Sequence, residues 1–366
     1  MCASRRDPAP VSLSLRGVSK TFGGQQVLKP FSLEIPAGCR AAVLGPSGCG
    51  KTTTLRLIAG LESPDPGGRV FLGGEDVTGT PAERRGVGMV FQDCELFPNL
   101  TVAGNVAYGL RARRAPARER RETVSRMLEM VRLADLADRR TEGLSGGQAQ
   151  RVALARTLAA GPRVLLLDEP LAALDAILRA SLREELEDLL GGLGMTTVLV
   201  THDQDEAMTL GDLIVVMRDG RVEQAGSPEE ICREPRTPFV AGFVGGGNRL
   251  AGRLEGGFLR LAGGAGIPLA SLRRGPAGAG DGLPAGPGGR VSVFFRPDRA
   301  RLGPAAPGRI SGTVVSSRSA GLKTRLAIRL EGGEIVKLEM EASPWAPGEA
   351  VGVELPPEEL HLFADP

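Results

Sequence analysis

Apolar residues along this chain of 366 residues change their spacing several times, and each change predicts a different element. Residues 41–44 (AAVL) form a short buried run that predicts a strand, and the glycine-rich stretch after it leads into a segment with helical apolar spacing. Two further apolar runs, at 163–168 (RVLLLD) and 196–201 (TTVLVT), also predict strands. Strands that alternate with helical segments are typical of a parallel sheet in an α/β domain.

The pattern changes twice more. Strand-like runs are scarce over about 96–160, where Arg, Glu, Leu and Ala dominate, so we expect a mostly helical insertion. Beyond Gly242 glycine becomes frequent, residues 275–289 (GPAGAGDGLPAGPGG) predict a flexible stretch, and residues 323–330 (KTRLAIRL) alternate as a half-buried strand does. We therefore predict an α/β domain over 1–242 and a small β-barrel domain over 243–366.

Composition excludes several classes of protein. The formal net charge is only +2, which argues against a protein that binds nucleic acid non-specifically. The six arginines of residues 111–121 (RARRAPARERR) lie near glutamates, and we favour a solvated helix face over a nucleic-acid patch. The five cysteines are scattered and odd in number, which suits a reducing compartment. No stretch approaches the roughly 18 apolar residues that a membrane span needs, so we expect a soluble, cytoplasmic chain.

The glycine-rich stretch matches the phosphate-loop pattern G-x-x-x-x-G-K-[ST] from Gly45 to Thr52, with a strand before it and a helix after it. Glycines let successive backbone N–H groups turn toward a phosphate, and the helix N-terminus adds the positive end of its dipole. We expect Lys51 to reach the β- and γ-phosphate oxygens and the Thr52 hydroxyl to ligate Mg²⁺. Cys49 lies in the same loop, where proximity to the helix N-terminus predicts a lowered thiol pKa.

Polar residues end the two other predicted strands. Asp168 and Glu169 follow one of them, at the carboxyl edge where ligands of open α/β sheets bind. We expect Asp168 to hold Mg²⁺ and Glu169 to orient and polarise an attacking water. His202 ends the other strand, from which it can reach a γ-phosphate.

A second glycine-rich helix start lies at Ser145, Gly146 and Gly147. A hydroxyl followed by two glycines makes a second anion-binding helix end in one chain. One nucleotide can use both ends if two copies pair head to tail, so that each ATP lies between the phosphate loop of one copy and the Ser-Gly-Gly end of the other.

At these residues the chain resembles the ATP-binding cassette (ABC) family along essentially its whole length. The resemblance identifies GPSGCGKTT as the Walker A loop, LSGGQ (144–148) as the signature, VLLLDEP as Walker B, AALD (172–175) as the D-loop and His202 as the switch histidine. It implies a P-loop NTPase with a RecA-like core and a helical subdomain. It also implies that Gln92 contacts Mg²⁺ and the attacking water, and that Phe22 stacks on adenine. The nucleotide would be held by Phe22, Gly45, Pro46, Ser47, Gly48, Cys49, Gly50, Lys51, Thr52, Thr53, Gln92, Ser145, Gly146, Gly147, Gln148, Asp168 and Asp175; the catalytic residues would be Lys51, Gln92, Glu169 and His202; and the Mg²⁺ ligands would be Thr52, Gln92 and Asp168.

More narrowly, the segments THDQDEAMTLGDLIVVM and GSPEEICREPRTPFVAGFVGGGNRL resemble ATPase subunits of bacterial importers for sugars, sulfate, polyamines or ferric iron. The C-terminal residues resemble the OB-like barrel, called TOBE, that follows the cassette in such subunits. The resemblance implies a homodimer that works with integral membrane permease subunits and, indirectly, with an extracytoplasmic solute-binding protein, at the cytoplasmic face of the plasma membrane. Polyamine or ferric iron is the favoured cargo, with sulfate, molybdate or sugar as alternatives.

Other functions remain as alternatives. A non-transport ABC ATPase of chromosome structure would have a long coiled coil between Lys51 and Ser145. A translation-factor ATPase would carry two cassettes in one chain, and an exporter half would carry its own membrane spans. A phosphotransferase would use the same phosphate loop, but the LSGGQ segment argues against it. For the C-terminal barrel, extension of the dimer interface is favoured over binding of a regulatory ligand, because its glycine-rich loops offer few convergent polar groups.

Overall fold

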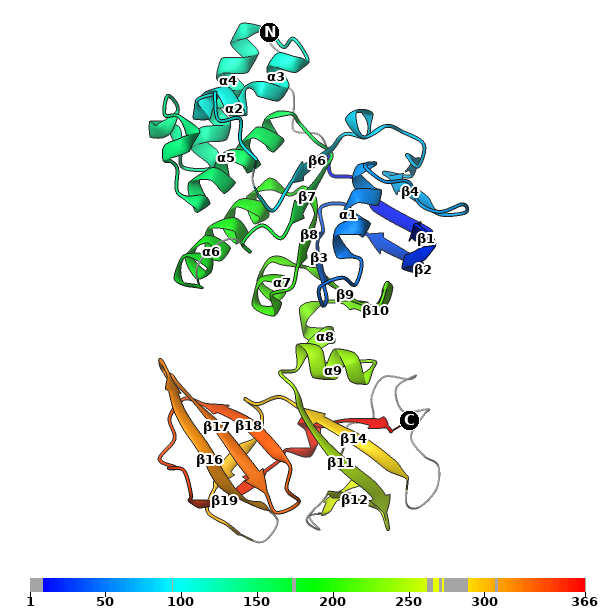
Figure 1. The fold of residues 1–366 in the computed structure, drawn as a ribbon, viewed down its shortest axis with the longest axis vertical. Coiled ribbons are helices and arrows are strands. Elements are labelled where there is room, and N and C mark those ends of the chain that lie inside the picture. Colours follow the sequence, from blue (N-terminus) through cyan, green and yellow to red (C-terminus); the bar gives the residue numbers. More distant parts are fainter. Residues whose placement is uncertain are drawn as a thin grey trace. The chain divides into compact units, whose positions relative to one another are not determined.

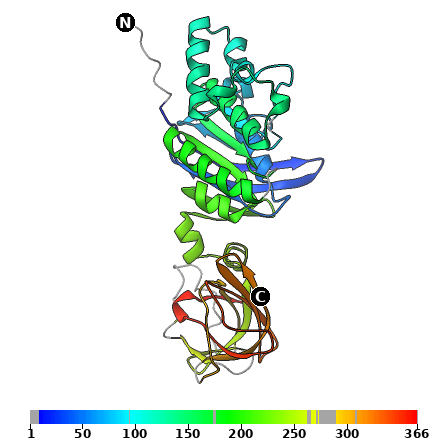
Figure 2. The ribbon, with the colours of Figure 1, turned by 90° about the vertical axis from the view of Figure 1, so that its left-hand side faces the viewer.

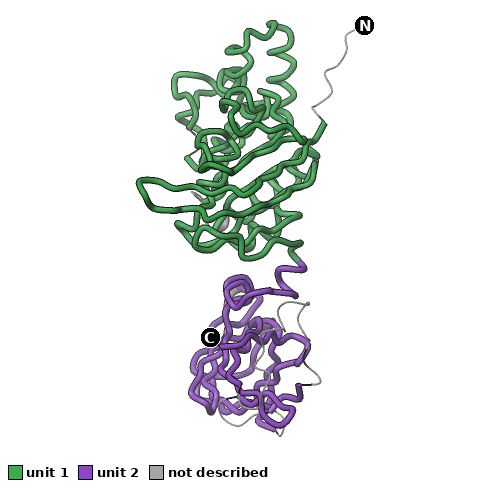
Figure 3. Tube along the Cα trace, turned by 90° about the vertical axis from the view of Figure 1, so that its right-hand side faces the viewer, with its two compact units in different colours: residues 1–228 green, residues 229–366 purple. Residues whose placement is uncertain are grey.

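The chain divides into two compact units, residues 1–228 and residues 229–366 (Figure 3). The computed structural model describes residues 9–93, 95–172, 176–261, 266–269, 272, 289–306 and 309–365. The predicted flexible stretch 275–289 lies outside the described residues except for Gly289.

A six-stranded, mostly parallel sheet forms the centre of the first unit (Figure 1). Its strands in spatial order are β10 (Arg221–Gly226), β9 (Leu213–Arg218), β3 (Arg40–Leu44), β8 (Thr196–Thr201), β7 (Val164–Asp168) and β6 (Val87–Val90). Only the edge strand β10 runs antiparallel to its neighbour. The three strands predicted from continuous apolar runs are β3, β7 and β8, which are confirmed, and they lie side by side in the middle of the sheet, where both faces are covered.

The register of these central strands brings their carboxyl ends to one edge. Leu44 of β3 lies beside Thr201 of β8, and Asp168 of β7 lies beside Val200 of β8. Each strand ends where the apolar run ends, so the polar residues that follow the strands emerge at the same edge of the sheet.

A second sheet of the first unit is antiparallel and contains β2 (Gln25–Ile35), β1 (Leu13–Phe22), β4 (Arg69–Leu72) and β5 (Glu75–Asp76), in that order. Strands β1 and β2 form a long hairpin, which is the projecting blue ribbon in Figure 2. Helix α1 (Lys51–Ala59) packs between the two sheets, because Leu57 and Ile58 share one buried core with Leu13 of β1 and Val198 of β8.

Helices complete the first unit. The region predicted to be helical holds α2 (Val102–Val106), α3 (Tyr108–Ala112), α4 (Ala117–Met130) and α5 (Gly146–Ala159), with short 3₁₀ turns at Ala134–Leu136 and Thr141–Gly143. A further 3₁₀ turn lies at Ala82–Arg84. Helix α6 (Ala176–Leu193) follows β7 in the chain, and α7 (Gln204–Leu210) follows β8. In the arginine-rich segment, Arg113 pairs with Glu119 and Arg118 with Glu122, as expected of a solvated helix face.

The second unit is built from two five-stranded antiparallel sheets after two short helices, α8 (Pro228–Arg233) and α9 (Pro238–Val244). One sheet contains β13 (Gly266–Pro268), β12 (Phe258–Leu261), β11 (Asn248–Glu255), β14 (Arg290–Phe295) and β20 (His361–Ala364). The other contains β15 (Arg301–Gly303), β19 (Ala350–Glu354), β16 (Ile310–Ala320), β17 (Lys323–Leu330) and β18 (Ile335–Met340), and a 3₁₀ turn at Pro357–Glu359 precedes β20. Both sheets contribute to one apolar core, as in an OB-like barrel, and the alternating run 323–330 is β17 as predicted.

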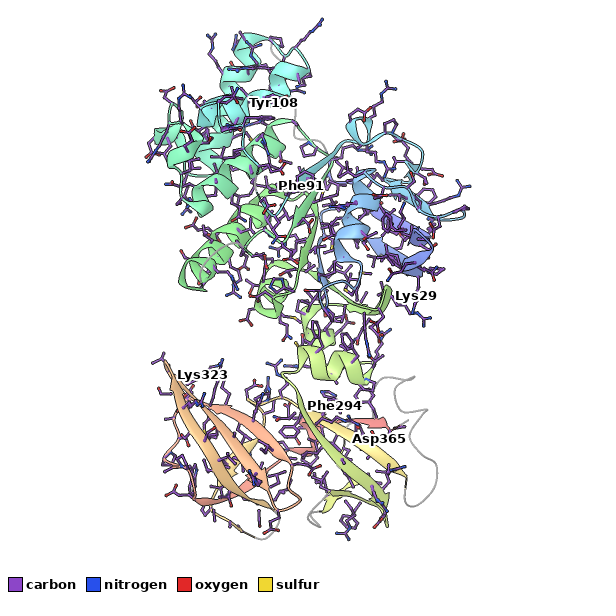
Figure 4. All side chains as sticks on the ribbon, viewed as in Figure 1. Lys29, Phe91, Tyr108, Phe294, Lys323 and Asp365 are labelled. Carbon is purple, nitrogen blue, oxygen red and sulfur yellow. The ribbon has the colours of Figure 1, made fainter. Side chains whose placement is uncertain are left out.

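The sequence-based boundary at 242 and 243 falls within the second unit, near the end of α9. Ala241 of α9 packs with Phe294 of β14 and Phe363 of β20, and a Cβ atom added to Gly242 would lie 3.3 Å from the Phe294 ring. Figure 4 labels Phe294 on its strand. Helix α9 therefore packs on the barrel sheet.

Candidate nucleotide site

The loop between β3 and α1 is compressed against its neighbours, and only glycine fits at two of its positions. A Cβ atom at Gly45 would lie 2.3 Å from the carbonyl oxygen of Met217, and one at Gly50 would lie 2.3 Å from Cδ2 of Leu28. Gly50 also has φ +103°, a left-handed conformation that residues with a Cβ atom rarely adopt. The glycines thus let the chain pass tightly between β9 and β2 and begin α1 at Lys51.

Lys51 lies inside this loop rather than on the surface. Its side chain is only 5% exposed, and Nζ donates hydrogen bonds to the carbonyl oxygens of Gly45 (2.8 Å) and Pro46 (3.0 Å). The loop therefore wraps around a fixed positive charge, while Pro46, Ser47 and Gly48 form its exposed rim. A buried ammonium ringed by backbone groups is suited to bind phosphate oxygens.

Thr52 and Asp168 lie side by side, although 116 positions separate them in the sequence. The Thr52 hydroxyl, in the first turn of α1, donates a hydrogen bond of 3.1 Å to Oδ1 of Asp168 at the end of β7. Burial raises the pKa of the Asp168 carboxyl, while the Thr52 bond and the charges of Arg56 and Lys51 oppose that shift. A hydroxyl and a carboxylate side by side are hard oxygen donors of the kind that Mg²⁺ prefers, so these residues fit that ion.

Glu169 and His202 form a second pair at the same edge of the sheet. Glu169 has φ +45°, and its backbone N–H donates to the carbonyl oxygen of Val200 (2.9 Å). Its Oε2 lies 3.1 Å from Nδ1 of His202, the residue after β8. The carboxyl group is partly shielded at 20% exposure and the imidazole is half-exposed, so the pair opens toward solvent. A left-handed conformation at a residue with a side chain costs free energy and commonly marks a functional position.

Gln92 and Phe22 are both exposed, and Gln92 lies at this edge of the parallel sheet. Gln92 is the second residue after β6, whose carboxyl end lies beside that of β7. Figure 4 shows the neighbouring Phe91 where β6 ends. Phe22 ends β1, is 41% exposed, and has Nζ of Lys20 4.7 Å from the centre of its ring. An exposed aromatic ring with an adjacent cation can stack on a nucleotide base.

Ser145 begins α5 with a capping box. Its hydroxyl accepts a hydrogen bond from the Gln148 backbone N–H (3.3 Å), and Oε1 of Gln148 accepts one from the Ser145 backbone N–H (3.0 Å). Ser145 and Gly146 are exposed, whereas a Cβ atom at Gly147 would lie 2.7 Å from Leu182 of α6. The glycine at 147 thus allows α5 to approach α6 and leaves the helix end facing solvent.

Cys49, Asp175 and Thr53 complete the residues that the sequence predicts to contact nucleotide. The prediction of a lowered pKa for Cys49 is wrong: the thiol is only 4% exposed, and burial raises its pKa more than the nearby Lys51 charge lowers it. Asp175, predicted to contact nucleotide, lies outside the described residues. Thr53 lies half-buried in the first turn of α1.

Sequence reasoning missed several residues that hold the site together. Arg156 of α5 donates to the Glu95 carbonyl oxygen (2.8 Å) and lies over the ring of Phe97, which stacks on Tyr108 with ring centres 4.2 Å apart. These contacts fix the segment after Gln92 to the helices. Glu206 is buried in the first turn of α7, which begins two residues after His202. The sequence signal for Glu206 is an acidic residue on the apolar face of a helix.

Comparison with known proteins gives a consistent result. Residues 28–172 match the family model described as ABC transporter, and residues 293–363 match the TOBE domain. The chain is 45% identical to the sulfate/thiosulfate import ATP-binding protein CysA 2 of Chromobacterium violaceum over 96% of this chain and 95% of that protein. It is 44% identical to the spermidine/putrescine import ATP-binding protein PotA of Thermobifida fusca over 93% of this chain and 89% of that protein.

Among solved structures, cbiO1 of Clostridium perfringens, part of the ABC transporter complex cbiONQ, is similar with a TM-score of 0.56 and 32% identity, covering 60% of this chain and 89% of that one. Within the described residues, no helix is both long and apolar enough to cross a membrane. The two domain matches and the relatives aligned over nearly their whole length show that this chain belongs to the ABC transporter family, as an importer-type, ATP-binding ATPase with a C-terminal TOBE domain.

Proposed function

We propose that this chain is the ATPase subunit of a bacterial ABC importer, and that two copies pair head to tail around two molecules of ATP and Mg²⁺. The observation that carries the proposal is the meeting of two polar pairs at one sheet edge: Thr52 with Asp168 at 3.1 Å, and Glu169 with His202 at 3.1 Å. The first pair suits a metal-bound triphosphate and the second suits a positioned water.

Each residue has a distinct part in the proposed hydrolysis. Lys51 and the loop N–H groups bind the β- and γ-phosphate oxygens, and Thr52, Asp168 and Gln92 would hold Mg²⁺, which would neutralise charge on the transferring phosphoryl group. Glu169 accepts a hydrogen bond from the attacking water and orients it in line with the γ-phosphorus. His202 holds the Glu169 carboxyl in place and contacts the γ-phosphate. Phe22 stacks on the adenine base.

The signature helix supplies the other half of each site from the second copy. Ser145 and Gly146 are exposed at the start of α5, and Ser47 and Gly48 are exposed on the phosphate loop, so both surfaces are open to a partner. A shift of the closed dimer from 1:99 to 99:1 needs about 5.5 kcal/mol of differential binding. Contacts from Ser145, Gly147 and His202 to the γ-phosphate, which ADP lacks, can provide it.

Coupling to transport would pass through the segment after Gln92. Arg156 and Tyr108 anchor that segment to α5 and α3, so a change at Gln92 is transmitted to an exposed part of the helical region. We propose that integral membrane permease subunits dock there and place the chain at the cytoplasmic face of the plasma membrane. An extracytoplasmic solute-binding protein would deliver the solute.

Polyamine and ferric iron are the cargoes favoured from the sequence, and one group of relatives is named for spermidine/putrescine import. Sulfate or thiosulfate is the alternative, since a relative of nearly equal identity is named for it. Molybdate and sugar stay as further alternatives from the sequence. The ATPase chain contacts the permease rather than the solute in this proposal, so copurification of the permease and solute-binding protein decides the cargo.

The dimer is tested with Glu169→Gln, which keeps the shape of the side chain and removes its charge. We expect this variant to bind Mg-ATP, to hydrolyse it at least about a hundredfold more slowly, and to sediment as a dimer with ATP but not with ADP. Glu83→Gln is the matched control: this exposed glutamate lies in the 3₁₀ turn 82–84, and its variant should hydrolyse ATP as the unaltered chain does. A Glu169→Gln chain that stays monomeric with saturating ATP would contradict the proposal.

A further inference from the structure

Glu206 is a buried acidic residue that the proposed chemistry does not use. It lies in the first turn of α7, and its side chain is only 3% exposed. Its Oε2 accepts a hydrogen bond of 2.5 Å from the Thr201 hydroxyl, whereas its Oε1 is buried and has no hydrogen-bond partner among the residues that the structure describes. Ala207 and Leu210 share this buried face, where an apolar side chain would be expected.

Hydrogen bonds link Glu206 to the residues on either side of His202 in the chain. Oγ1 of Thr201 accepts a hydrogen bond from the Asp203 backbone N–H (3.0 Å), so its own proton is directed to Glu206. Asp203 Oδ1 in turn accepts from the Glu206 backbone N–H (3.1 Å) and caps α7. Thr201 and Asp203 are the two neighbours of His202 in the chain, and both are tied to Glu206.

Thr201 is held from the other side as well. It is the last residue of β8 and pairs in register with Leu44, the last residue of β3 before the phosphate loop. The Thr201 hydroxyl therefore fixes the point at which the chain leaves the sheet, and His202 follows directly with its Nδ1 3.1 Å from the Glu169 carboxyl. Loss of the hydrogen bond from the Thr201 hydroxyl to Glu206 would loosen the turn that orients the His202 imidazole toward Glu169.

Charged groups from two elements face Glu206. One is Asp203, the N-cap residue of α7. The others are two arginines of α6: Arg179 lies 3.7 Å from Asp203, and Arg183 lies 3.8 Å from Asp205. Burial, followed by the Asp203 charge, raises the pKa of Glu206 to about 7, against the Thr201 bond and the two arginines. An acidic group buried with one oxygen unpaired costs free energy that leucine at the same position would not cost.

We propose that Glu206 is a positioning residue for ATP hydrolysis, which holds His202 opposite Glu169 by fixing the Thr201 hydroxyl. The inference rests on the proposed role of His202. It explains why this position carries a carboxyl group: the Thr201 proton needs an acceptor inside the fold, and an apolar side chain cannot provide one. Glu206 itself does not contact the nucleotide.

Two pairs of variants test the inference. Thr201→Val removes the hydroxyl at constant shape and Thr201→Ser restores it; Glu206→Leu removes the acceptor and Glu206→Gln restores it. We expect the Val and Leu variants to lower kcat for ATP at least about tenfold, with the Kd for Mg-ATP changed less than about twofold, and the Ser and Gln variants to recover most of the loss. Asp205→Asn is the matched control, because this exposed carboxyl lies in the same helical turn, and its variant should leave kcat unchanged.

The chain contains only two histidines, His202 and His361, which allows a direct readout of position. In protein labelled with ¹³C-histidine, Thr201→Val and Glu206→Leu should move the His202 Cε1–H resonance. The resonance of His361, in β20 of the second unit, should stay in place and serves as the internal reference. A loss of ATP binding together with kcat, with no recovery in the Ser and Gln variants, would overturn the inference and indicate a purely structural residue.

His202→Ala separates this inference from the proposed function. If His202→Ala abolishes hydrolysis while Thr201→Val and Glu206→Leu retain full kcat, the positioning role of Glu206 is wrong and the proposed function stands. If His202→Ala itself retains full kcat, the role of His202 in the proposed function is wrong, and the inference falls with it.

Discussion

Nδ1 of His202 lies 3.1 Å from Oε2 of Glu169, and each of the two residues is the first to follow its strand. Strands β7 and β8 are parallel neighbours, with Asp168 beside Val200, so the two chain ends emerge next to each other. The positive φ of Glu169 (+45°) turns its side chain out of the strand direction and toward β8. The pairing is therefore a product of strand register plus one unusual backbone conformation.

The first prediction concerns this pair. His202→Ala removes the imidazole that holds the Glu169 carboxyl, so we expect kcat for ATP to fall about a hundredfold or more, in the range for loss of an acid–base partner. The Kd for Mg-ATP should change little, because Lys51 and the loop N–H groups remain. Phosphate release and binding of a fluorescent ATP analogue measure the two quantities. His361→Ala, which alters the other histidine, should leave both unchanged.

The second prediction tests the head-to-tail arrangement by mixing two inactive variants. Lys51→Ala disables the phosphate loop, and Ser145→Arg blocks the signature end by placing a bulky side chain at an exposed helix start. Each homodimer lacks any complete site. A mixed dimer combines the intact loop of one chain with the intact signature of the other and so has one complete site.

After equilibration of equal amounts, half of the dimers are mixed, so ATPase activity should recover to at most about one quarter of that of the unaltered chain. Steady-state phosphate release at several mixing ratios measures the recovery, which should be greatest at equal amounts. If each nucleotide is instead held by a single chain, every mixture would be as inactive as its components.

The sequence was informative where chemistry and structure are local. The phosphate loop could be predicted because its glycines, its lysine and the flanking strand and helix are contiguous, and the central strands could be predicted because buried parallel strands are continuous apolar runs. The antiparallel sheet could not be read in the same way. In β1 the register shifts between Leu15 and Val18 and again beyond it, which breaks the alternation of buried and exposed residues on which strand prediction depends.

Contacts between distant segments were also beyond the sequence. The hydrogen bond from Arg156 to the Glu95 carbonyl oxygen joins positions 61 residues apart, and no local sequence pattern in either segment predicts it. The Cys49 thiol shows a related limit: its position near a helix N-terminus predicts a lowered pKa, but the raised pKa follows from burial, which depends on packing by the whole unit.

A third prediction separates backbone strain from close packing in the phosphate loop. Gly50→Ala combines a left-handed φ of +103° with a Cβ atom 2.3 Å from Leu28, so we expect loss of ATP binding and destabilisation by several kcal/mol. Gly24→Ala is the matched control: it has φ +86° but nothing within 4 Å of the added Cβ atom, so only the conformational cost of about 1–2 kcal/mol applies. Thermal unfolding and ATP titration of both variants measure the difference, and equal behaviour would contradict the packing argument.

The last prediction concerns the pH dependence of stability. The pKa of Glu206 is about 7 in the folded chain against 4.5 in the unfolded chain, so between these values the folded state binds more protons. As pH rises from about 4.5 to about 7, the contribution of Glu206 to the free energy of unfolding therefore falls by on the order of 3 kcal/mol, and it stays low at higher pH. Glu206→Gln cannot titrate, so its stability should fall less over this range than that of the unaltered chain.

Urea unfolding at pH 5 and pH 8, followed by circular dichroism, measures this difference between the unaltered chain and Glu206→Gln. The transition to analyse is the one that Mg-ATP shifts, because it belongs to the unit that contains the phosphate loop. Asp168, whose pKa is also raised, is present in both proteins and cancels in the comparison. Glu83→Gln removes an exposed carboxyl and should follow the unaltered chain at both pH values, whereas an equal pH response in Glu206→Gln would show that Glu206 is ionised in the folded state throughout.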